Sequence, residues 1–121
     1  MNKLELFLKK EWQSDEKLLN FYDDFDDYKN YMVESIEQYK ELQKEIEQYK
    51  GTLEEFIETL EFGYNNYEEN KYVDFCYGNL TVTVIVKDNK LILSNFIEIW
   101  NDRYNALLNA PFDINEYLNL M

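Results

Sequence analysis

The sequence has no histidine, one cysteine and only three glycines, and each scarcity excludes a class of functional site. Without histidine, neither a Ser-His nor a Cys-His pair can form for nucleophilic catalysis, and the usual zinc-binding combinations are missing. The few glycines leave no phosphate-binding loop of the Walker or dinucleotide-binding type. A lone cysteine, Cys76, cannot form an intramolecular disulfide, which fits a reducing, cytoplasmic setting. We therefore expect a protein that is not an enzyme and that needs no cofactor.

Two other kinds of site, a reactive thiol and a metal site, are disfavoured by the local sequence. Cys76 lies between two aromatic residues on a predicted strand, which favours a buried structural thiol over a reactive one. The aspartates at positions 23–27 could attract a divalent cation, because hard cations prefer clustered oxygen atoms. Their spacing departs from the EF-hand, which needs a glutamate at the twelfth loop position, where Ser35 stands if Asp24 is first. We expect no metal site.

Long hydrophobic runs are absent as well. Lys9 and Lys10 follow a short apolar run, whereas a signal peptide carries its basic residues before a longer one. No stretch reaches the length that a membrane-spanning helix needs. We expect neither a signal peptide nor a contact with a membrane.

What the sequence has in excess is negative charge. Its 25 acidic residues stand against 12 basic ones, for a formal net charge of −13 at pH 7. Hydrophobic residues still make up 45% and aromatic residues 17%, so the 121 residues can fold, and their number suits one domain, residues 1–121. Such a surface repels nucleic acids and attracts basic proteins. The alternative is that the acidity serves only solubility.

Apolar residues at helical spacing predict that residues 1–70 are helical. Leu4, Leu8 and Trp12 mark one face of a short first helix. From Asp15 to Lys50 apolar residues recur every three or four positions, which predicts a long amphipathic helix. At 1.5 Å per residue this helix would span roughly 54 Å, longer than a domain of this size is wide. We therefore expect a kink in its middle, near residue 30, or a protruding end.

A second helix is predicted after a short connection. Gly51 is placed to end the first helix in a left-handed conformation, and Thr52 with Glu55 forms a capping box that starts the next one. The apolar face of this second helix continues to Tyr67. Because the connection is short, we expect the two helices to pack as a long, acidic, antiparallel hairpin.

Between residues 71 and 94 the pattern changes to strict alternation, which is typical of strands. Two-residue turns at Gly78-Asn79 and Asp88-Asn89 separate three alternating segments. We expect a three-stranded antiparallel meander, with one face covered by the helices. The predicted fold class is therefore α+β.

The remaining residues, 95–121, are predicted to form C-terminal helices. Asn95 and Glu98 have the spacing of a capping box, and apolar residues at helical spacing follow them. Asp113 and Glu116 have the same spacing and would cap a last short helical turn.

The acidic residues of the predicted hairpin recur mostly three, four or seven positions apart, opposite its apolar stripe. Like charges at these spacings repel and cost roughly 0.2–0.5 kcal/mol per pair, so an anionic binding surface is one reason to keep them. The residues expected to contact a partner are Asp23, Asp24, Asp26, Asp27, Glu34, Glu37, Glu41, Glu54, Glu58, Glu61, Glu68 and Glu69.

The small size, the acidic helices, the meander with a helix after it and the lack of catalytic residues resemble a known kind of protein. These features resemble the small acidic DNA-mimic inhibitors of phages and other mobile elements, including anti-CRISPR proteins. The resemblance implies a stoichiometric inhibitor whose carboxylates take the place of phosphates in the basic groove of a defence nuclease, such as a CRISPR effector. It implies no direct binding of nucleic acid, and it transfers no site residue because no motif is shared.

Two other interpretations stay open. An immunity protein or antitoxin that neutralises a basic toxin enzyme would use the same kind of surface. A structural oligomer could instead pair its long helix through Phe25, Met32, Ile36 and Tyr39, although this stripe is too aromatic for a regular coiled coil. A monomer and a dimer are both compatible with the sequence.

Overall fold

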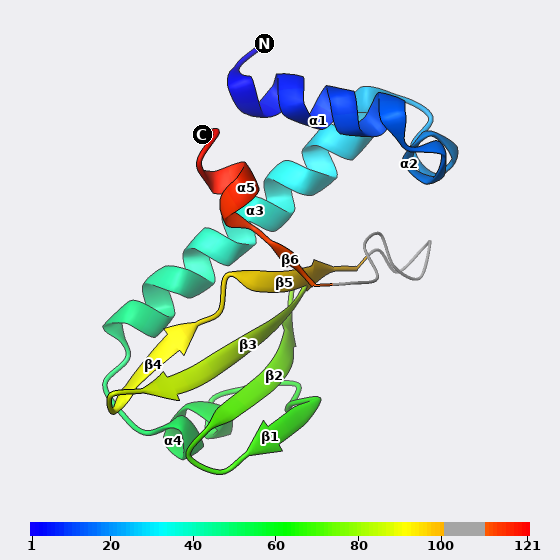
Figure 1. The fold of residues 1–121 in the computed structure, drawn as a ribbon. Coiled ribbons are helices and arrows are strands. Elements are labelled where there is room, and N and C mark those ends of the chain that lie inside the picture. Colours follow the sequence, from blue (N-terminus) through cyan, green and yellow to red (C-terminus); the bar gives the residue numbers. More distant parts are fainter. Residues whose placement is uncertain (101–110) are drawn as a thin grey trace.

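A computed structural model of the chain describes residues 1–100 and 111–121 (Figure 1). The fold is α+β, which confirms the predicted class. The helices are α1 (Lys3–Ser14), α2 (Glu16–Phe21), α3 (Phe25–Gln48), α4 (Leu53–Glu58) and α5 (Asn115–Leu118). The strands are β1 (Asn66–Glu68), β2 (Tyr72–Tyr77), β3 (Leu80–Lys87), β4 (Lys90–Leu93), β5 (Phe96–Ile99) and β6 (Phe112–Asp113).

The strands of the described residues form one antiparallel sheet of six strands, so a three-stranded meander is a wrong description of it. β2, β3 and β4 pair in succession, with residues 88 and 89 at positive φ in the turn between β3 and β4. β1 pairs with the outer edge of β2, and β5 and β6 extend the sheet on the other side of β3. The three additional strands span only two to four residues each, too short for a reliable alternation in the sequence.

β5 lies where the sequence predicts a helix beginning at Asn95, so that prediction is wrong. Ile97 and Ile99 are buried on one side of the strand, and Ile99 pairs with Leu80 of β3. Burial of these alternating side chains outweighs the local capping signal. The Asn95 amide instead donates a hydrogen bond to the Asp113 carboxylate at 2.8 Å. Three apolar residues predicted to follow in the same helix lie outside the described residues; they are Tyr104, Leu107 and Leu108.

The core forms between α3 and one face of the sheet. In Figure 1, α3 runs from α1 and α2 at one end of the molecule to β4 at the other. Its buried residues are Tyr28, Met32, Ser35, Ile36, Tyr39, Leu42 and Ile46. The sheet contributes Val73, Phe75, Leu80, Val82, Val84, Leu93, Ile97 and Ile99 to the same cluster. α3 is thereby held along most of its length, which fixes the direction of its opposite, exposed side.

The predicted helix from Asp15 to Lys50 is interrupted, and the interruption is not in its middle. α2 ends at Phe21, Tyr22 is extended, and α3 begins after Asp24. The Asp24 side chain caps α3 by accepting a hydrogen bond from the Asp27 amide at 3.0 Å. The indole of Trp12 donates to the Tyr22 carbonyl at 3.1 Å. Both contacts stabilise the break, which lets α1 and α2 lie beside the first turns of α3.

The predicted helical hairpin is also wrong, because its second helix is short. α3 ends at Gln48 with Tyr49 extended, and Gly51 has no positive φ, so Gly51 is not a left-handed cap. The capping box of Thr52 and Glu55 is confirmed, but α4 has only six residues. Residues 66–68 form β1 instead of a helix, and residues 59–65 make the turns that lead to it.

Of the predicted C-terminal helices, the described residues contain one short helix, α5. Asp113 accepts a hydrogen bond from the Asn115 amide at 2.9 Å, but the residue at the N-cap position is Ile114, whose side chain makes no capping bond. Ile114 and Tyr117 are buried.

Candidate partner-binding surface

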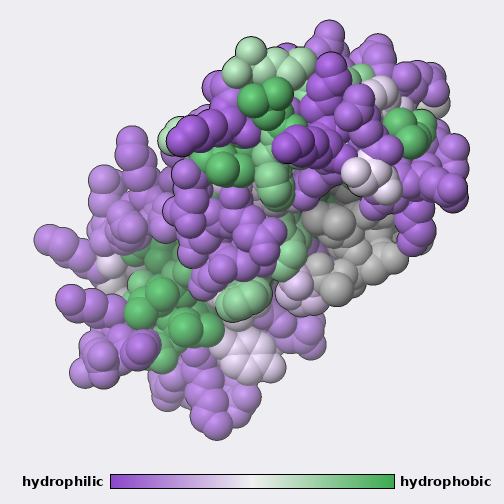
Figure 2. All heavy atoms as spheres, turned by 45° about the horizontal axis from the view of Figure 1, so that its top comes forward, coloured by the Kyte–Doolittle hydropathy of each residue, from purple (hydrophilic) through white to green (hydrophobic). Residues whose placement is uncertain are grey.

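The exposed side of α3 carries an ordered series of carboxylates. Asp27, Glu34, Glu37 and Glu41 are all exposed and lie seven, three and four positions apart, so they share one face of the helix, with Asp23 exposed just before it. We call these five residues the α3 acidic row. The row is opposite the buried side, so packing of the helix on the sheet directs these carboxylates to solvent. Figure 2 shows a molecular face covered mostly by hydrophilic residues, with one larger hydrophobic area at its lower left.

Two predicted site residues near the start of α3 already have structural partners. The Asp24 side chain caps the helix. The Asp26 carboxylate lies 3.5 Å from the Lys29 ammonium, in an exposed ion pair that contributes little to stability. These residues add negative charge to the surface, but their presence is explained without a partner.

The acids predicted after α3 do not continue the row on a second long helix. Glu54 accepts hydrogen bonds from the Tyr67 hydroxyl at 3.1 Å and the Asn70 amide at 2.9 Å. The bond from the Asn70 amide is the main cause that lowers the pKa of Glu54. Glu54 therefore holds the turn between β1 and β2, where Asn70 has a φ of 61°.

The other four acids of this group lie in four different segments of the chain. Glu58 ends α4, Glu61 lies in the segment after it, and Glu69 lies in the turn after β1; all three are exposed. Glu68 forms an ion pair with Lys71 at 2.8 Å. The structure therefore does not bring the second half of the predicted site onto one helix face.

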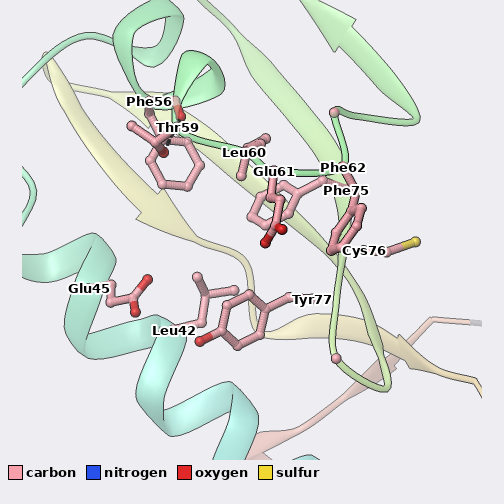
Figure 3. Close-up of a pocket in the computed structure, with 12 residues that line it drawn as sticks. Leu42, Glu45, Phe56, Thr59, Leu60, Glu61, Phe62, Phe75, Cys76 and Tyr77 are labelled. Atoms are coloured by element: carbon pink, nitrogen blue, oxygen red, sulfur yellow. Dashed lines mark hydrogen bonds between the residues drawn. The ribbon is translucent and has the colours of Figure 1, made fainter.

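Sequence reasoning missed a pocket between α3, β2 and the segment that follows α4. Its volume is about 340 Å³, and we call it the α3–β2 pocket. Apolar walls come from residues that are distant in sequence, among them Leu42, Phe56 and Phe75. Figure 3 shows Glu45 projecting from α3 on one side and Glu61 on the other, while the Tyr77 hydroxyl points toward α3. Only the exposed position of Glu45, one helical turn after Glu41, could have been found in the sequence.

The electrostatic environment of the pocket is negative. Among the described residues that line it are two glutamates and no lysine or arginine. Burial raises the pKa of the Tyr77 hydroxyl, and the nearby carboxylates of Glu45 and Glu41 raise it further. The pocket therefore joins the α3 acidic row at its Glu41 end.

Exposed aromatic side chains lie beside the pocket. Phe62 is 90% exposed and Tyr64 is 50% exposed, and both flank Gly63, whose φ of 74° permits a tight reversal of the chain. The ring of Tyr64 lies 5.4 Å from the ring of Tyr67. A large aromatic side chain that is left in solvent is a common anchor for a partner.

A third missed feature, the Glu11 carboxylate of α1, is structural. It accepts hydrogen bonds from the Tyr28 hydroxyl at 3.0 Å and the Tyr117 hydroxyl at 2.9 Å. Burial raises the pKa of Glu11, and it also raises the pKa of both tyrosines. The three side chains connect α1, α3 and α5.

Cys76 does not occupy the buried position that the sequence predicts. Its thiol is exposed, and in Figure 3 its sulfur points away from the α3–β2 pocket. The reason is the register of β2, which buries Val73 and Phe75 and turns the alternate residues to the other face of the sheet.

Most of the apolar stripe through which a helical oligomer was expected to pair is buried within the same chain. Met32, Ile36 and Tyr39 are each at most 1% exposed, because they form the core with the sheet of the same chain. These side chains are not available to a second copy.

Comparison of the chain with protein-family models, with curated proteins and with solved structures gave no match. Across residues 1–100 and 111–121, no group of three or more potential ligand side chains is arranged to hold a metal ion. In the same residues no helix is both long and apolar enough to cross a membrane. The α3 acidic row and the α3–β2 pocket are therefore the features from which a function can be inferred.

Proposed function

We propose that the protein is a stoichiometric inhibitor that binds the basic nucleic-acid groove of a defence nuclease through the α3 acidic row. The row would occupy the groove as a DNA mimic, in the manner of anti-CRISPR proteins. The partner is a basic nucleic-acid-binding protein, and the inhibitor acts by occupation rather than by chemistry, in the cytoplasm.

The observation that carries this proposal is the row on a helix held along its length. From Asp27 to Glu41 the row spans about 21 Å at 1.5 Å per residue. A DNA strand presents about six phosphates over that length, so four carboxylates form a sparser series of the same sign, with steps of roughly 4.5–10.5 Å. A groove lined by lysine and arginine would attract both series, because both present a line of negative charges.

A helix held by its core also lowers the entropic cost of binding. The carboxylates already point in one direction before the partner arrives, and only their side chains must be ordered. The repulsion between neighbouring carboxylates opposes folding in the free protein and is relieved when cations of a partner approach.

The proposal is tested by a DNA-cleavage assay in which each of a panel of purified CRISPR nucleases is mixed with an equimolar amount of the protein. Inhibition should be strongest when the protein is added before DNA, and the affinity should fall steeply as salt rises. A triple variant, with Glu34→Lys, Glu37→Lys and Glu41→Lys, should lose inhibition.

A matched variant controls for net charge. It changes Glu16→Lys, Glu47→Lys and Glu116→Lys, three exposed positions outside the α3 acidic row, and so alters the net charge by the same amount. This control variant should still inhibit the nuclease. Equal loss in both variants would point to overall charge, and an unchanged triple variant of the row would refute this surface.

A further inference from the structure

The α3–β2 pocket has exposed carboxylates beside an apolar interior. Neither Glu45 nor Glu61 has a hydrogen bond or an ion pair with any residue of the described parts of the chain. Two carboxylates line this cavity and no lysine or arginine of the described residues does, so its potential is negative and favours a cation. The charge of the pocket thus suits a cationic group of a partner.

The walls of the pocket suit a long side chain with an apolar stem. Leu42 and Phe75 are each about 1% exposed and close the deep side, and Phe56 lies beside them at 6%. The volume of about 340 Å³ is at the small end of the roughly 300–1,000 Å³ typical of ligand pockets. A single side chain is a better match to this size than a nucleotide or another large ligand.

The combination of aromatic rings and carboxylates favours guanidinium over ammonium. A guanidinium is planar, stacks on aromatic faces, and can bind a carboxylate with two parallel hydrogen bonds. An ammonium is more strongly hydrated and offers no planar face. Phe62, which is 90% exposed, supplies an accessible ring at the pocket, and Glu45 and Glu61 supply the acceptors.

We propose that the α3–β2 pocket binds an arginine side chain of the basic partner. The arginine would extend its stem between the apolar walls and direct its guanidinium to Glu45 and Glu61. Because Glu45 follows Glu41 by one helical turn, a partner lying along the α3 acidic row reaches the pocket without leaving the surface. This assignment rests on the proposed function for the identity of the partner, but the pocket can be tested alone.

The test uses N-acetyl-arginine amide as a probe, titrated into the isotopically labelled protein and followed by the amide resonances of Glu45, Glu61 and Tyr77. These resonances should shift and saturate. N-acetyl-citrulline amide has the same shape without the charge, and its affinity should be lower by a factor of about ten or more. N-acetyl-lysine amide should fall between them. Equal shifts with the lysine and arginine probes, or shifts elsewhere only, would overturn the assignment.

Matched variants separate the pocket from general acidity. The variant with Glu45→Gln and Glu61→Gln should weaken arginine-amide binding about tenfold, whereas Glu16→Gln with Glu116→Gln, with the same change in charge, should not. Equal weakening in both would overturn the proposal. Arginine-amide binding without inhibition of any nuclease would leave the pocket standing and count against the inhibitor. Inhibition without arginine-amide binding would count against the pocket assignment and leave the proposed inhibitor standing.

Discussion

The Glu11 carboxylate accepts a hydrogen bond from the Tyr117 hydroxyl at 2.9 Å, although 106 residues separate the two in the chain. The same carboxylate accepts a second bond from the Tyr28 hydroxyl of α3. A partly buried carboxylate is costly unless its oxygens are hydrogen-bonded, and here two tyrosines share that role. The contact joins the first and the last helix to α3, and α3 carries the acidic row.

Tyr117→Phe should lower the free energy of unfolding by about 1–3 kcal/mol, because it removes a hydrogen bond to a carboxylate and leaves that carboxylate less satisfied. Urea unfolding at pH 7 measures the change. Tyr64→Phe is the control, since Tyr64 is half exposed and its hydroxyl has no hydrogen bond in the described residues. A loss of equal size in both variants would contradict the role of Tyr117.

The stability of the protein should depend on pH through Glu11. Burial raises its pKa above the ordinary value of 4.5, so the folded state holds this proton more tightly than the unfolded state. The contribution is fully present below pH 4.5 and is lost as pH rises through the raised pKa. Glu11→Gln removes this titration, so the stability of the natural protein relative to the variant should fall between pH 4.5 and pH 7. Parallel pH profiles from chemical unfolding would contradict this assignment.

Gly78→Ala should destabilise the fold more than Gly63→Ala. Both glycines have positive φ, 56° and 74°, which costs a residue with a Cβ roughly 1–2 kcal/mol. A Cβ at Gly78 would also come within 2.5 Å of the Gln38 side chain, whereas one at Gly63 meets nothing within 4 Å. Gln38 accepts a hydrogen bond from the Asn79 amide at 2.8 Å, so displacing it weakens the contact between α3 and the β2–β3 turn. Thermal unfolding of the two variants tests the order.

Local signals in the sequence were sufficient where a few neighbouring residues decide the structure. The capping box of Thr52 and Glu55 and the turn at Asp88-Asn89 are both present, because caps and tight turns depend on side chains within four positions. The capping signal at Asn95 failed because the alternating isoleucines of β5 gain more by burial against α3 and the sheet. That gain depends on elements far away in the chain.

The candidate site, too, could be predicted only where residues close together in the sequence decide the structure. The exposed acids of α3 could be predicted from their spacing, because one helix face needs no knowledge of the rest of the fold. The break before α3 could not be predicted, because its capping residue, Asp24, stands in an acidic run that is equally typical of a continuous helix surface. The α3–β2 pocket could not be predicted, because its walls come from Leu42, Phe56 and Phe75 on three different elements.

Asp24 and Asp23 should differ in what they do, although they are neighbours with the same charge. Asp24→Ala should lower the free energy of unfolding by about 1 kcal/mol, because it removes the side chain that caps α3. Asp23→Ala removes an exposed carboxylate that has no hydrogen bond or ion pair in the described residues, so it should leave stability nearly unchanged. Any loss of inhibition caused by Asp23→Ala should then reflect weaker binding to the partner and not a loss of stability. Equal losses of stability would contradict the cap.

The α3 acidic row should itself destabilise the free protein. Glu37 has Glu34 three positions before it and Glu41 four positions after it, against one attractive neighbour, Lys40. Glu37→Gln therefore removes two repulsions and one attraction, and it should raise the free energy of unfolding by a few tenths of a kcal/mol, roughly 0.2–0.5. The gain should vanish at 1 M salt, where charges are screened beyond about 3 Å. A variant that is more stable and yet inhibits less would show that this residue is kept for binding at the expense of stability. A salt-independent gain, or a loss of stability, would contradict the repulsion.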